Sequence, residues 1–228
     1  MISLSLVIPT INSSKYIAMN VAKAEKFLKE CSFVGEYEIV VAAQTSRDDT
    51  FGVVNKIRSS TVIPLFFKTP GKGIGLTGGF KHAKYDWILM IDDDLPYSFE
   101  SMEKLFHFVN DYDVIIASRS LQGTEHKIPF VRRVASAGYL MLVRMSLGLK
   151  ERDIQAGMKL IKRELFSSVG YPKEKGYVWD TEMLMRVHKV GAKIIEVPVY
   201  CEHKQNELVV YKAAPRMALG LMRVWLRR

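Results

Sequence analysis

Residues 86–96 read DWILMIDDDLP, an apolar run that ends in three consecutive aspartates. A short, continuous apolar run between polar flanks is typical of a strand that is buried on both faces of a sheet. Ligands of parallel sheets bind at the carboxyl ends of the strands, and the aspartates follow this run directly. The stretch therefore predicts a buried strand at residues 87–91 with a binding site at its carboxyl end.

Short apolar runs and helical patterns alternate on both sides of this strand. Further strands are expected at residues 3–9, 37–43, 62–68 and 114–118, and helices at residues 13–31, 48–57, 75–85 and 98–110. The first of these helices is expected to begin at an Asn12 or Ser13 cap. This alternation predicts an α/β fold, in which helices cover both faces of a mostly parallel, twisted sheet.

The regular alternation ends after residue 120. The expected elements are a loop at 123–129, an apolar helix at 131–149, a strand at 158–160, a helix at 180–190, a strand at 194–199 and a final helix at 215–228. On the final helix, one narrow sector holds Arg216, Gly220, Arg223 and Arg227, and apolar side chains fill the remainder. Such a C-terminal amphipathic helix is either buried against the domain or laid in a membrane interface.

The basic residues are concentrated in the second half of the chain. The 228 residues carry a formal charge of +9, yet residues 1–125 hold 13 basic and 15 acidic side chains, and residues 126–228 hold 20 and 9. A basic half of this kind suits nucleic acid, an anionic membrane surface or a phosphorylated substrate. Nucleic acid is the weakest of these, because aliphatic residues and not aromatic stacking platforms separate the basic ones.

Composition and local patterns exclude several classes of protein. An apolar fraction of 48% and a charged fraction of 25% are those of a folded domain, not of a disordered chain. Cys31 and Cys201 have no CxxC or histidine neighbours, so we expect two buried thiols in a reducing compartment and no zinc or redox site. The start of the chain lacks a basic segment and contains Pro9, which predicts a strand and not a signal peptide. No run of about 18 uncharged apolar residues is present, so the chain should not span a membrane.

The aspartate triplet is the strongest candidate for a metal site. Three adjacent carboxylates repel one another unless a cation lies among them, and alternate strand residues point the same way, so Asp92 and Asp94 can converge on one ion. Oxygen ligands without His or Cys nearby favour Mg²⁺ or Mn²⁺ over zinc. The structural alternative is a solvated acidic turn at the end of the strand.

A glycine-rich stretch, GKGIGLTGG at residues 71–79, is expected to open a helix. Its backbone N–H groups and Lys72 could hold a phosphate there. The stretch satisfies neither GxxxxGK[ST] nor GxGxxG, so it is neither a P-loop nor a dinucleotide fingerprint. Taken alone, it fits a flexible turn equally well.

Other polar residues are compatible with catalysis or with structural capping. Arg133 and Arg144 lie three helical turns apart, on one face of the apolar helix expected at 131–149. Further candidates are Asp180 and Glu182 at a helix start, and Asp153 and Gln155 in a polar turn. Their spacing alone identifies no reaction.

In order along the chain, nine stretches resemble the inverting GT-A glycosyltransferases of family 2, and within them the dolichol-phosphate mannose synthase group. The stretches are SLVIPTIN, YEIVV, GKGIGLTGGFKHA, DWILMIDDDLP, DVIIASRS, RRVASAGYLMLVRMSLGL, RDIQAGMKLIKRELF, VWDTEMLMRVHKVGAKIIEVPV and APRMALGLMRVW. They cover nearly the whole chain, and no single one is decisive. The resemblance implies the GT-A fold, a nucleotide sugar donor (GDP-mannose or UDP-glucose) and a dolichyl or other polyprenyl phosphate acceptor.

The resemblance also implies a place for each candidate residue. Asp92 and Asp94 match the acids that hold Mg²⁺ or Mn²⁺ on the donor diphosphate. The implied donor-binding residues are Pro9, Thr10, Ile11, Ser13, Val41, Ala43, Lys72 and Asp93, and the implied acceptor or catalytic residues are Arg119, Arg133, Arg144, Asp153, Gln155, Asp180 and Glu182. Because a phosphate acceptor is already anionic near neutral pH, Asp180 would orient groups and need not abstract a proton.

Three departures from the family pattern concern the donor. Where most relatives read VVDDGSTDGT, this chain reads VVAAQTSRDDT, so Ala42 and Ala43 replace the acids that usually contact the base. Ile11-Asn12-Ser13 replaces Tyr-Asn-Glu, and Pro96 replaces a glutamine that often follows the metal aspartates. The nucleotide and the sugar therefore stay open, while the residues for metal and phosphate are present.

Two other functions stay open at this point. A family 2 enzyme could use a glycan hydroxyl as acceptor, with Asp180 as the base, or the chain could be a catalytically silent adaptor at a membrane. We expect a catalytic domain at residues 1–205, with a donor half at 1–120 and an acceptor half at 121–205, followed by an interfacial helix at 206–228. The expected location is the cytoplasmic face of a membrane, reached through the helices or through a small membrane-protein partner.

Overall fold

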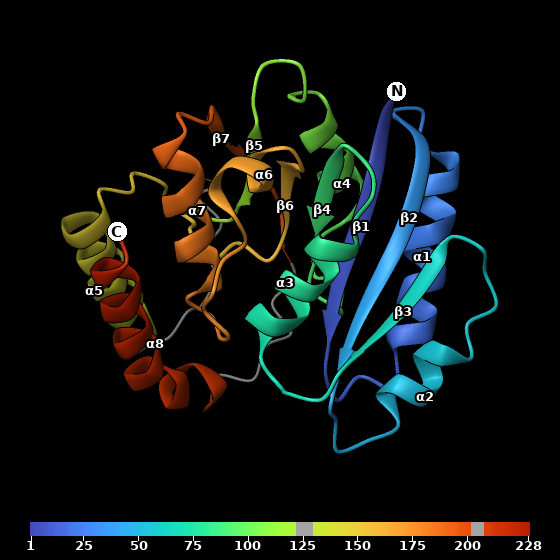
Figure 1. Cartoon of the computed structure of the whole chain (residues 1–228), viewed down its shortest axis with the longest axis horizontal. Helices are drawn as coiled ribbons and strands as arrows, with labels where there is room; N and C mark the ends of the chain where they lie inside the picture. Colours follow the sequence, from blue (N-terminus) through green and yellow to red (C-terminus); the bar gives the residue numbers. More distant parts are fainter. Residues whose placement is uncertain (122–129, 202–207) are drawn as a thin grey trace.

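The computed structural model describes residues 1–121, 130–201 and 208–228, with only the helical course given for residues 130–136 and 208–214. In these residues a seven-stranded sheet has the order β3-β2-β1-β4-β6-β5-β7 (Figure 1). The strands are β1 (Ile2–Thr10), β2 (Val34–Gln44), β3 (Val62–Phe67), β4 (Trp87–Met90), β5 (Val114–Ser118), β6 (Lys159–Lys162) and β7 (Ile194–Pro198). β6 runs antiparallel to β4 and β5, and the other neighbours are parallel. The expected α/β fold is confirmed.

Helices cover both faces of the sheet. One face carries α1 (Ile17–Glu30), α2 (Thr50–Asn55) and α4 (Phe99–Phe106), and the other carries α3 (Lys72–His82), α6 (Leu165–Val169), α7 (Trp179–Lys189), α5 (Phe130–Leu147) and α8 (Leu208–Leu226). Figure 1 shows α5 and α8 side by side at the edge of the molecule, where the two helices contact each other. The chain thus ends on the same side as α3 and α7.

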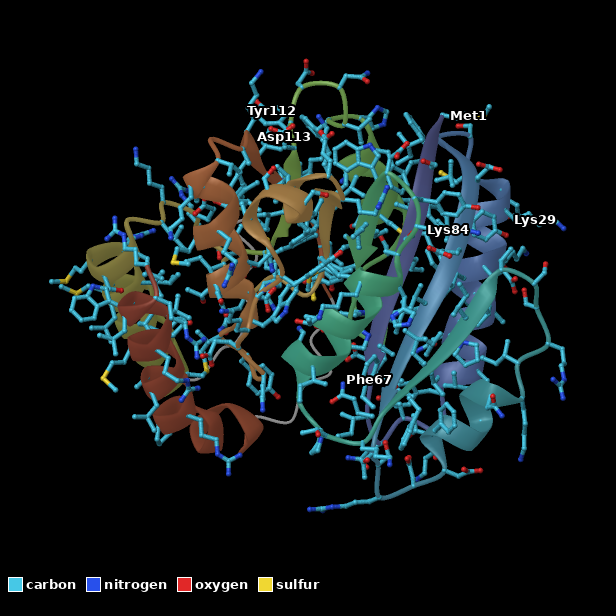
Figure 2. All side chains as sticks on the ribbon, viewed as in Figure 1. Met1, Lys29, Phe67, Lys84, Tyr112 and Asp113 are labelled. Atoms are coloured by element: carbon cyan, nitrogen blue, oxygen red, sulfur yellow. The ribbon has the colours of Figure 1, made fainter. Side chains whose placement is uncertain are left out.

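β1 is buried on both faces of the sheet, where side chains fill the space between the sheet and the helices (Figure 2). Leu4, Leu6 and Ile8 point into the core formed with α1 and α4, whereas Val7 belongs to the core formed with α3 and α7. Each core contributes apolar burial, which is the main favourable term in folding. β1 therefore stands in the centre of the molecule, and its carboxyl end lies between two layers of helices.

The glycine-rich stretch opens α3, as expected, but the helix begins at Lys72, three residues earlier than the sequence suggested. α3 begins at Lys72, and a Cβ atom on Gly79 would lie 2.4 Å from Val7 Cγ1 of β1. A Cβ atom on Gly75 would lie 2.7 Å from the Gln44 side chain. These glycines allow the helix backbone to lie directly on the sheet, which places the first turn of α3 at the carboxyl ends of the strands.

Other element boundaries also differ from the expectations. α1 begins at Ile17 with Tyr16 at its N-cap position and no side-chain cap, and not at the Asn12 or Ser13 cap that we expected; the Ser13 hydroxyl bonds to Asp93 and to the Ile11 carbonyl. α8 begins at Leu208 and contains Pro215 in its interior, whereas we expected a start at Pro215. The short helix α6 was not expected, and the loop expected at 123–129 lies outside the described residues.

Candidate functional site

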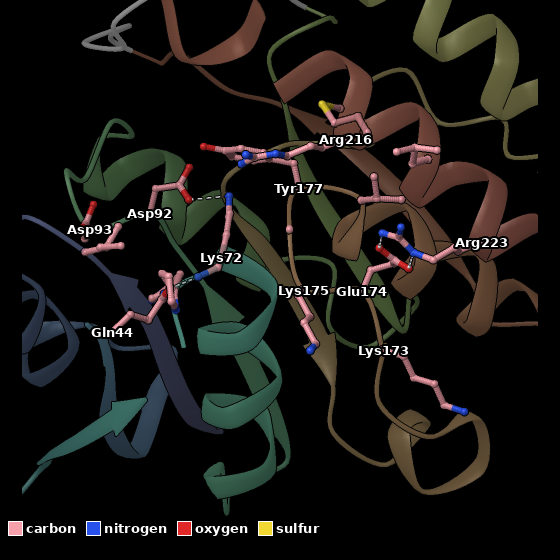
Figure 3. Close-up of a pocket in the computed structure, with 18 of the residues that line it drawn as sticks. Gln44, Lys72, Asp92, Asp93, Lys173, Glu174, Lys175, Tyr177, Arg216 and Arg223 are labelled. Carbon is pink, nitrogen blue, oxygen red and sulfur yellow. Dashed lines mark hydrogen bonds and ion pairs between the residues drawn. The ribbon is translucent and has the colours of Figure 1, made fainter. Parts of the chain in front are cut away.

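A cavity of about 960 Å³ opens at the carboxyl ends of β1 and β2 and at the turn after β4 (Figure 3). One side, here called the carboxylate wall, consists of Asp92, Asp93, Asp94 and Lys72. The opposite side, the α8 wall, consists of Arg216, Met217, Leu219, Arg223 and Arg227, and a connecting loop at residues 172–178 lies between the two. The cavity therefore lies where ligands of parallel sheets bind.

The aspartates stand in a turn beyond the end of β4. The Leu95 N–H donates to the Asp92 carbonyl at 3.1 Å, which closes the turn. The strand alternation expected for these residues does not apply there, yet Asp92 and Asp94 line the same cavity. The turn thus places both acids on the carboxylate wall by a different geometry from the one the sequence suggested.

The middle aspartate serves the framework of the site. Asp93 accepts hydrogen bonds from the Thr10 hydroxyl at 2.6 Å and from the Ser13 hydroxyl. Burial raises the pKa of Asp93, and these two hydroxyl bonds oppose that rise. Asp93 thereby connects the turn after β4 to the end of β1, because its carboxylate binds the hydroxyl groups of Thr10 and Ser13.

Lys72 forms an ion pair across the carboxylate wall. Its Nζ lies 2.7 Å from Asp92 Oδ1. Burial disfavours the charged ammonium, but the carboxylates of Asp92 and Asp180 outweigh burial and raise the pKa of Lys72. The lysine is therefore charged at neutral pH and can bind an anionic group that enters the cavity.

Main-chain contacts fix the turn that carries Lys72. The Gly71 N–H donates to Gln44 Oε1 at 2.6 Å, and the Gly73 N–H donates to the Lys175 carbonyl at 3.0 Å. Gly71 has φ +147, and a Cβ atom there would lie 2.4 Å from that same carbonyl. Only glycine tolerates this combination of backbone angle and close contact.

The carboxylate wall fits a hard divalent cation. Mg²⁺ in nucleotide sites is usually held by one or two carboxylates together with substrate phosphates, and Asp92 and Asp94 supply two. The described residues contain no group of three His, Cys, Asp or Glu side chains that could hold an ion by themselves. The ammonium beside Asp92 shows that a positive charge is favoured at this wall. The donor set therefore suits a cation whose coordination a diphosphate completes.

The residues implied for nucleotide binding divide into two groups. Pro9 and Ile11 line the cavity, together with Gln44. Thr10, Ser13, Val41 and Ala43 are buried and do not line it. The first group could contact a nucleotide directly, and the second supports the strand ends behind it.

The arginine of the SRS stretch is engaged in a buried ion pair. Arg119 Nε and Nη2 each donate to the Asp153 carboxylate at 2.8 Å, and its backbone N–H donates to Asp153 at 2.9 Å. Burial raises the pKa of Asp153, but the Arg119 contacts outweigh burial and hold that pKa below its ordinary value. Arg119 also donates to the Gln155 carbonyl at 3.3 Å. The structure thus brings together three of the implied residues, away from the lining of the cavity.

A second buried pair holds Asp180. Lys159 is fully buried on β6, and its Nζ lies 2.5 Å from Asp180 Oδ1 and 2.6 Å from the Ala156 carbonyl. Burial lowers the pKa of Lys159, and the carboxylate of Asp180 opposes that fall. The sequence reasoning missed Lys159, although a lysine within an apolar strand is a signal that a buried partner exists.

The remaining implied residues lie in other places. Glu182 is buried, accepts the backbone N–H groups of Lys173 and Glu174, and pairs with Arg186. Arg144 is exposed on α5. The side chain of Arg133 lies outside the described residues. Glu182 therefore supports the connecting loop through the hydrogen bonds that it accepts from the loop backbone.

Helix α8 is docked on the connecting loop by Glu174. Glu174 is buried and accepts two hydrogen bonds from Arg223, at 2.9 and 2.8 Å, and one from Arg227 at 3.3 Å. A Cβ atom on Gly220 would lie 2.8 Å from Val178, so the helix approaches the loop closely. The narrow sector of the final helix that the sequence predicted to hold the arginines does lie on one side of α8, and this side faces the cavity. Glu174 was missed, because nothing in its local sequence marks it as a partner for the final helix.

The outer side of this helical pair is apolar. The exposed side chains, here called the apolar face, are Met141, Leu142 and Met145 on α5 and Leu219, Met222, Trp225 and Leu226 on α8. Arg228 at the end of α8 donates to the Ser146 carbonyl of α5 at 2.9 Å, which joins the two helices. Among the helices that the structure describes, none is long and apolar enough to cross a membrane.

Curated relatives cover most of this chain. Glycosyltransferase AglD of Haloferax volcanii is 27% identical over 98% of the chain and 37% of its own length. Dolichol-phosphate mannosyltransferase of Pyrococcus furiosus is 29% identical over 85% of the chain and 55% of its own length. The chain thus spans about one third to one half of these relatives.

A solved structure matches the fold. Glucosyl-3-phosphoglycerate synthase from Mycobacterium tuberculosis, in complex with Mn²⁺, UDP-glucose and phosphoglyceric acid, superposes with a TM-score of 0.71 at 19% identity over 98% of this chain and 80% of that one. The model of the family described as glycosyl transferase family 2 matches residues 5–170, which include β1, the glycine-rich helix α3 and the aspartate turn. The chain therefore belongs to glycosyl transferase family 2.

Proposed function

We propose that this chain transfers a hexose from a nucleoside-diphosphate sugar to a polyprenyl phosphate at a membrane surface. One observation carries the proposal: a single cavity has acidic metal-type ligands on one wall, and on the other a basic helix with an apolar outer side. A nucleotide sugar requires the first wall, and an amphiphilic phosphate suits the second. The mannosyltransferase relative from Pyrococcus furiosus acts, by its name, on dolichol phosphate, which supports this choice of acceptor.

At the carboxylate wall, Asp92 and Asp94 would hold Mg²⁺ or Mn²⁺, and Lys72 would bind the donor diphosphate. The bound cation would neutralise the negative charge that develops on the departing diphosphate. The solved relative with Mn²⁺ and UDP-glucose supports a metal-dependent donor site. The donor is GDP-mannose or UDP-glucose. Its nucleoside would contact Pro9, Ile11 and Gln44, which line the cavity.

The transfer is a single displacement at the anomeric carbon. An acceptor phosphate oxygen forms the new bond to that carbon, the bond from the carbon to the diphosphate oxygen breaks, and the electron pair leaves with the nucleoside diphosphate. The configuration inverts. Because a phosphate is already anionic near neutral pH, no general base is needed. Lys159 holds Asp180 in a buried ion pair. A carboxylate that is fixed in this way is suited to orient neighbouring groups.

The apolar face supports a peripheral location on the membrane. Met145 and Leu226 are 73% and 69% exposed, and they lie on the two helices that Arg228 joins. Insertion of such side chains at the boundary between headgroups and acyl chains, with arginines at the headgroups, stabilises a protein on an anionic bilayer. The proposed surface is the cytoplasmic leaflet, and a small membrane-protein partner is the alternative anchor. Residues 1–205 would form the catalytic domain, with donor and acceptor halves divided near residue 120, and residues 206–228 the interfacial helix.

The direct test is a transfer assay with Mn²⁺ or Mg²⁺, GDP-mannose or UDP-glucose, and dolichyl phosphate. We expect a lipid-phosphate-linked hexose, and a loss of roughly 100-fold or more in Asp92→Ala and Asp94→Ala, because the cation contributes several kcal/mol of charge stabilisation. Circular dichroism controls for folding. Unchanged turnover in both variants would overturn the proposal. Transfer to glycan hydroxyls alone would favour the other acceptor, and absence of calorimetric binding to every donor would favour the adaptor.

A further inference from the structure

Three of the six positive side chains that line the cavity are paired with a carboxylate. Lys72 pairs with Asp92 on the carboxylate wall. Arg223 and Arg227 both bond to Glu174 on the α8 wall. These side chains hold the site together, so an entering anion must compete with an existing partner to bind them.

Arg216 is different from the other two arginines of the α8 wall. It is exposed, it lines the cavity, and no described carboxylate lies within ion-pair distance of it. In Figure 3 the side chains of Arg216 and Tyr177 extend into the cavity toward the Lys72–Asp92 pair. A guanidinium in such a place carries uncompensated donors that match the oxygens of a phosphate.

The two lysines of the connecting loop do not share this orientation. Lys173 and Lys175 also belong to the lining, but in Figure 3 both side chains point away from the Lys72–Asp92 pair. Lys173 is exposed, lines the same cavity and carries the same charge as Arg216. It therefore offers a matched control for effects of net charge alone.

The anchoring of α8 gives Arg216 a defined position. Arg223 lies two helical turns beyond Arg216, on the same side of the helix, and its bidentate bond to Glu174 fixes the rotation of α8 about its axis. Gly220 lies between these two arginines in the sequence, and its close approach to Val178 restricts rotation of α8 about its axis. The contacts of Arg223 and Gly220 thus hold Arg216 at the cavity, and Arg216 needs no ion pair to keep its position.

We propose that Arg216 binds the phosphate of the lipid acceptor and thereby selects phosphorylated over unphosphorylated polyprenols. The inference rests on the proposed function, and it assigns the acceptor end of the cavity to the α8 wall. The acceptor phosphate then lies between Arg216 and the donor diphosphate held at Lys72. Because Arg216 and the α8 part of the apolar face lie on one helix, a lipid whose tail follows the outer side of α8 places its phosphate at this arginine.

Direct binding tests the inference without relying on turnover. The probes are farnesyl phosphate and farnesol, which share a tail and differ in the phosphate, measured by calorimetry in the presence of Mn²⁺. We expect the wild-type protein to bind farnesyl phosphate about tenfold or more tightly than farnesol, and Arg216→Ala to lose that preference. Arg216→Lys should keep part of it, and Lys173→Ala should keep all of it.

Three results would overturn the inference. The first is an unchanged preference for the phosphate in Arg216→Ala when its melting temperature matches that of the wild type. The second is an equal loss in Lys173→Ala, which would show a general effect of charge. The third is a tenfold loss of affinity for GDP-mannose or UDP-glucose in Arg216→Ala with lipid binding unchanged, which would assign Arg216 to the donor.

The same variants separate this inference from the proposed function. With dolichyl phosphate as acceptor, Arg216→Ala should raise the acceptor KM about tenfold or more, while the dissociation constant of the donor stays within about twofold. If the wild type binds farnesyl phosphate through Arg216 yet transfers no hexose to dolichyl phosphate, the proposed function fails and the assignment of Arg216 stands.

Discussion

At the scale of single residues, Lys72 owes its position to the main chain around it. Gly71 and Gly73 form their hydrogen bonds through backbone atoms, with Gln44 and with the connecting loop. The lysine side chain contributes the ion pair with Asp92 but no part of that framework. Its replacement should therefore change the charge of the carboxylate wall and leave the turn intact.

Lys72→Met should weaken binding of the nucleotide sugar by roughly tenfold to 100-fold in the presence of Mn²⁺, because a charged hydrogen bond to a diphosphate is worth about 1.5–3 kcal/mol. Calorimetry with GDP-mannose and UDP-glucose measures the change. Lys81→Met on the same helix is the control, since Lys81 is exposed at the far end of α3. Equal affinities for the wild type and Lys72→Met would contradict this use of the lysine.

The pair between Arg119 and Asp153 makes stability depend on pH. The pKa of Asp153 is held below its ordinary value of 3.8, so the stability it contributes is complete above that value and is lost as the pH falls through the lowered pKa. Asp153→Asn should cost about 3 kcal/mol in the free energy of unfolding at pH 7, because Arg119 is left unpaired. The difference between wild type and variant should shrink toward pH 3 in denaturant titrations. A difference that is constant from pH 7 to pH 3 would refute the prediction.

At the scale of elements, local patterns predicted most strands and helices, and contacts between distant segments decided the rest. β5 occupies Val114–Ser118 as expected, because a short apolar run suffices to define it. α3 begins earlier than expected, at Lys72, where the Gly73 N–H donates to the carbonyl of Lys175, which lies far away in sequence. Likewise, Asp92, Asp94 and Lys72 were identified from their motifs, whereas Lys159 and Glu174 owe their importance to partners on other elements. Spacing along one segment carries no information about such pairs.

The packing of α3 on β1 predicts opposite effects for two glycine substitutions. Gly79→Ala would place Cβ 2.4 Å from Val7 Cγ1 and should destabilise the protein by about 1–3 kcal/mol through overpacking. Gly138→Ala, on α5, meets nothing within 4 Å and should stabilise by about 0.5–1 kcal/mol through helix propensity. Thermal and denaturant unfolding of both variants measures the contrast. Similar effects of the two substitutions would disprove the close packing.

At the scale of the whole molecule, charge and apolarity are arranged around one cavity. The second half of the sequence supplies both the basic α8 wall and the apolar face behind it. The first half supplies the carboxylate wall. Part of the positive charge of residues 126–228 therefore lies on the helix that we propose meets the membrane.

The apolar face predicts where substitutions weaken binding to vesicles. Met145→Asp or Leu226→Asp should each lower the affinity for anionic phosphatidylglycerol vesicles about tenfold, because burial of such a side chain is worth about 1.5–3 kcal/mol. Met19→Asp is the matched control, since Met19 is 54% exposed on α1, on the opposite side of the sheet. Vesicle sedimentation measures the bound fraction. An equal loss in all three variants would point to charge repulsion alone and against a defined membrane face.

The antiparallel strand β6 governs the order in which the sheet can be assembled. β6 lies between β4 and β5, so the strands formed by residues 87–90 and 114–118 are not neighbours and stay unjoined until residues 159–162 have been synthesised (Figure 1). In a nascent chain that ends near residue 120, β4 has an open edge and β5 lacks both of its neighbours, and such open edges are sites for aggregation. The donor and acceptor halves that we propose therefore share one sheet, and we expect neither to fold alone. The seven-stranded sheet can therefore be completed only after residues 159–162 have left the ribosome.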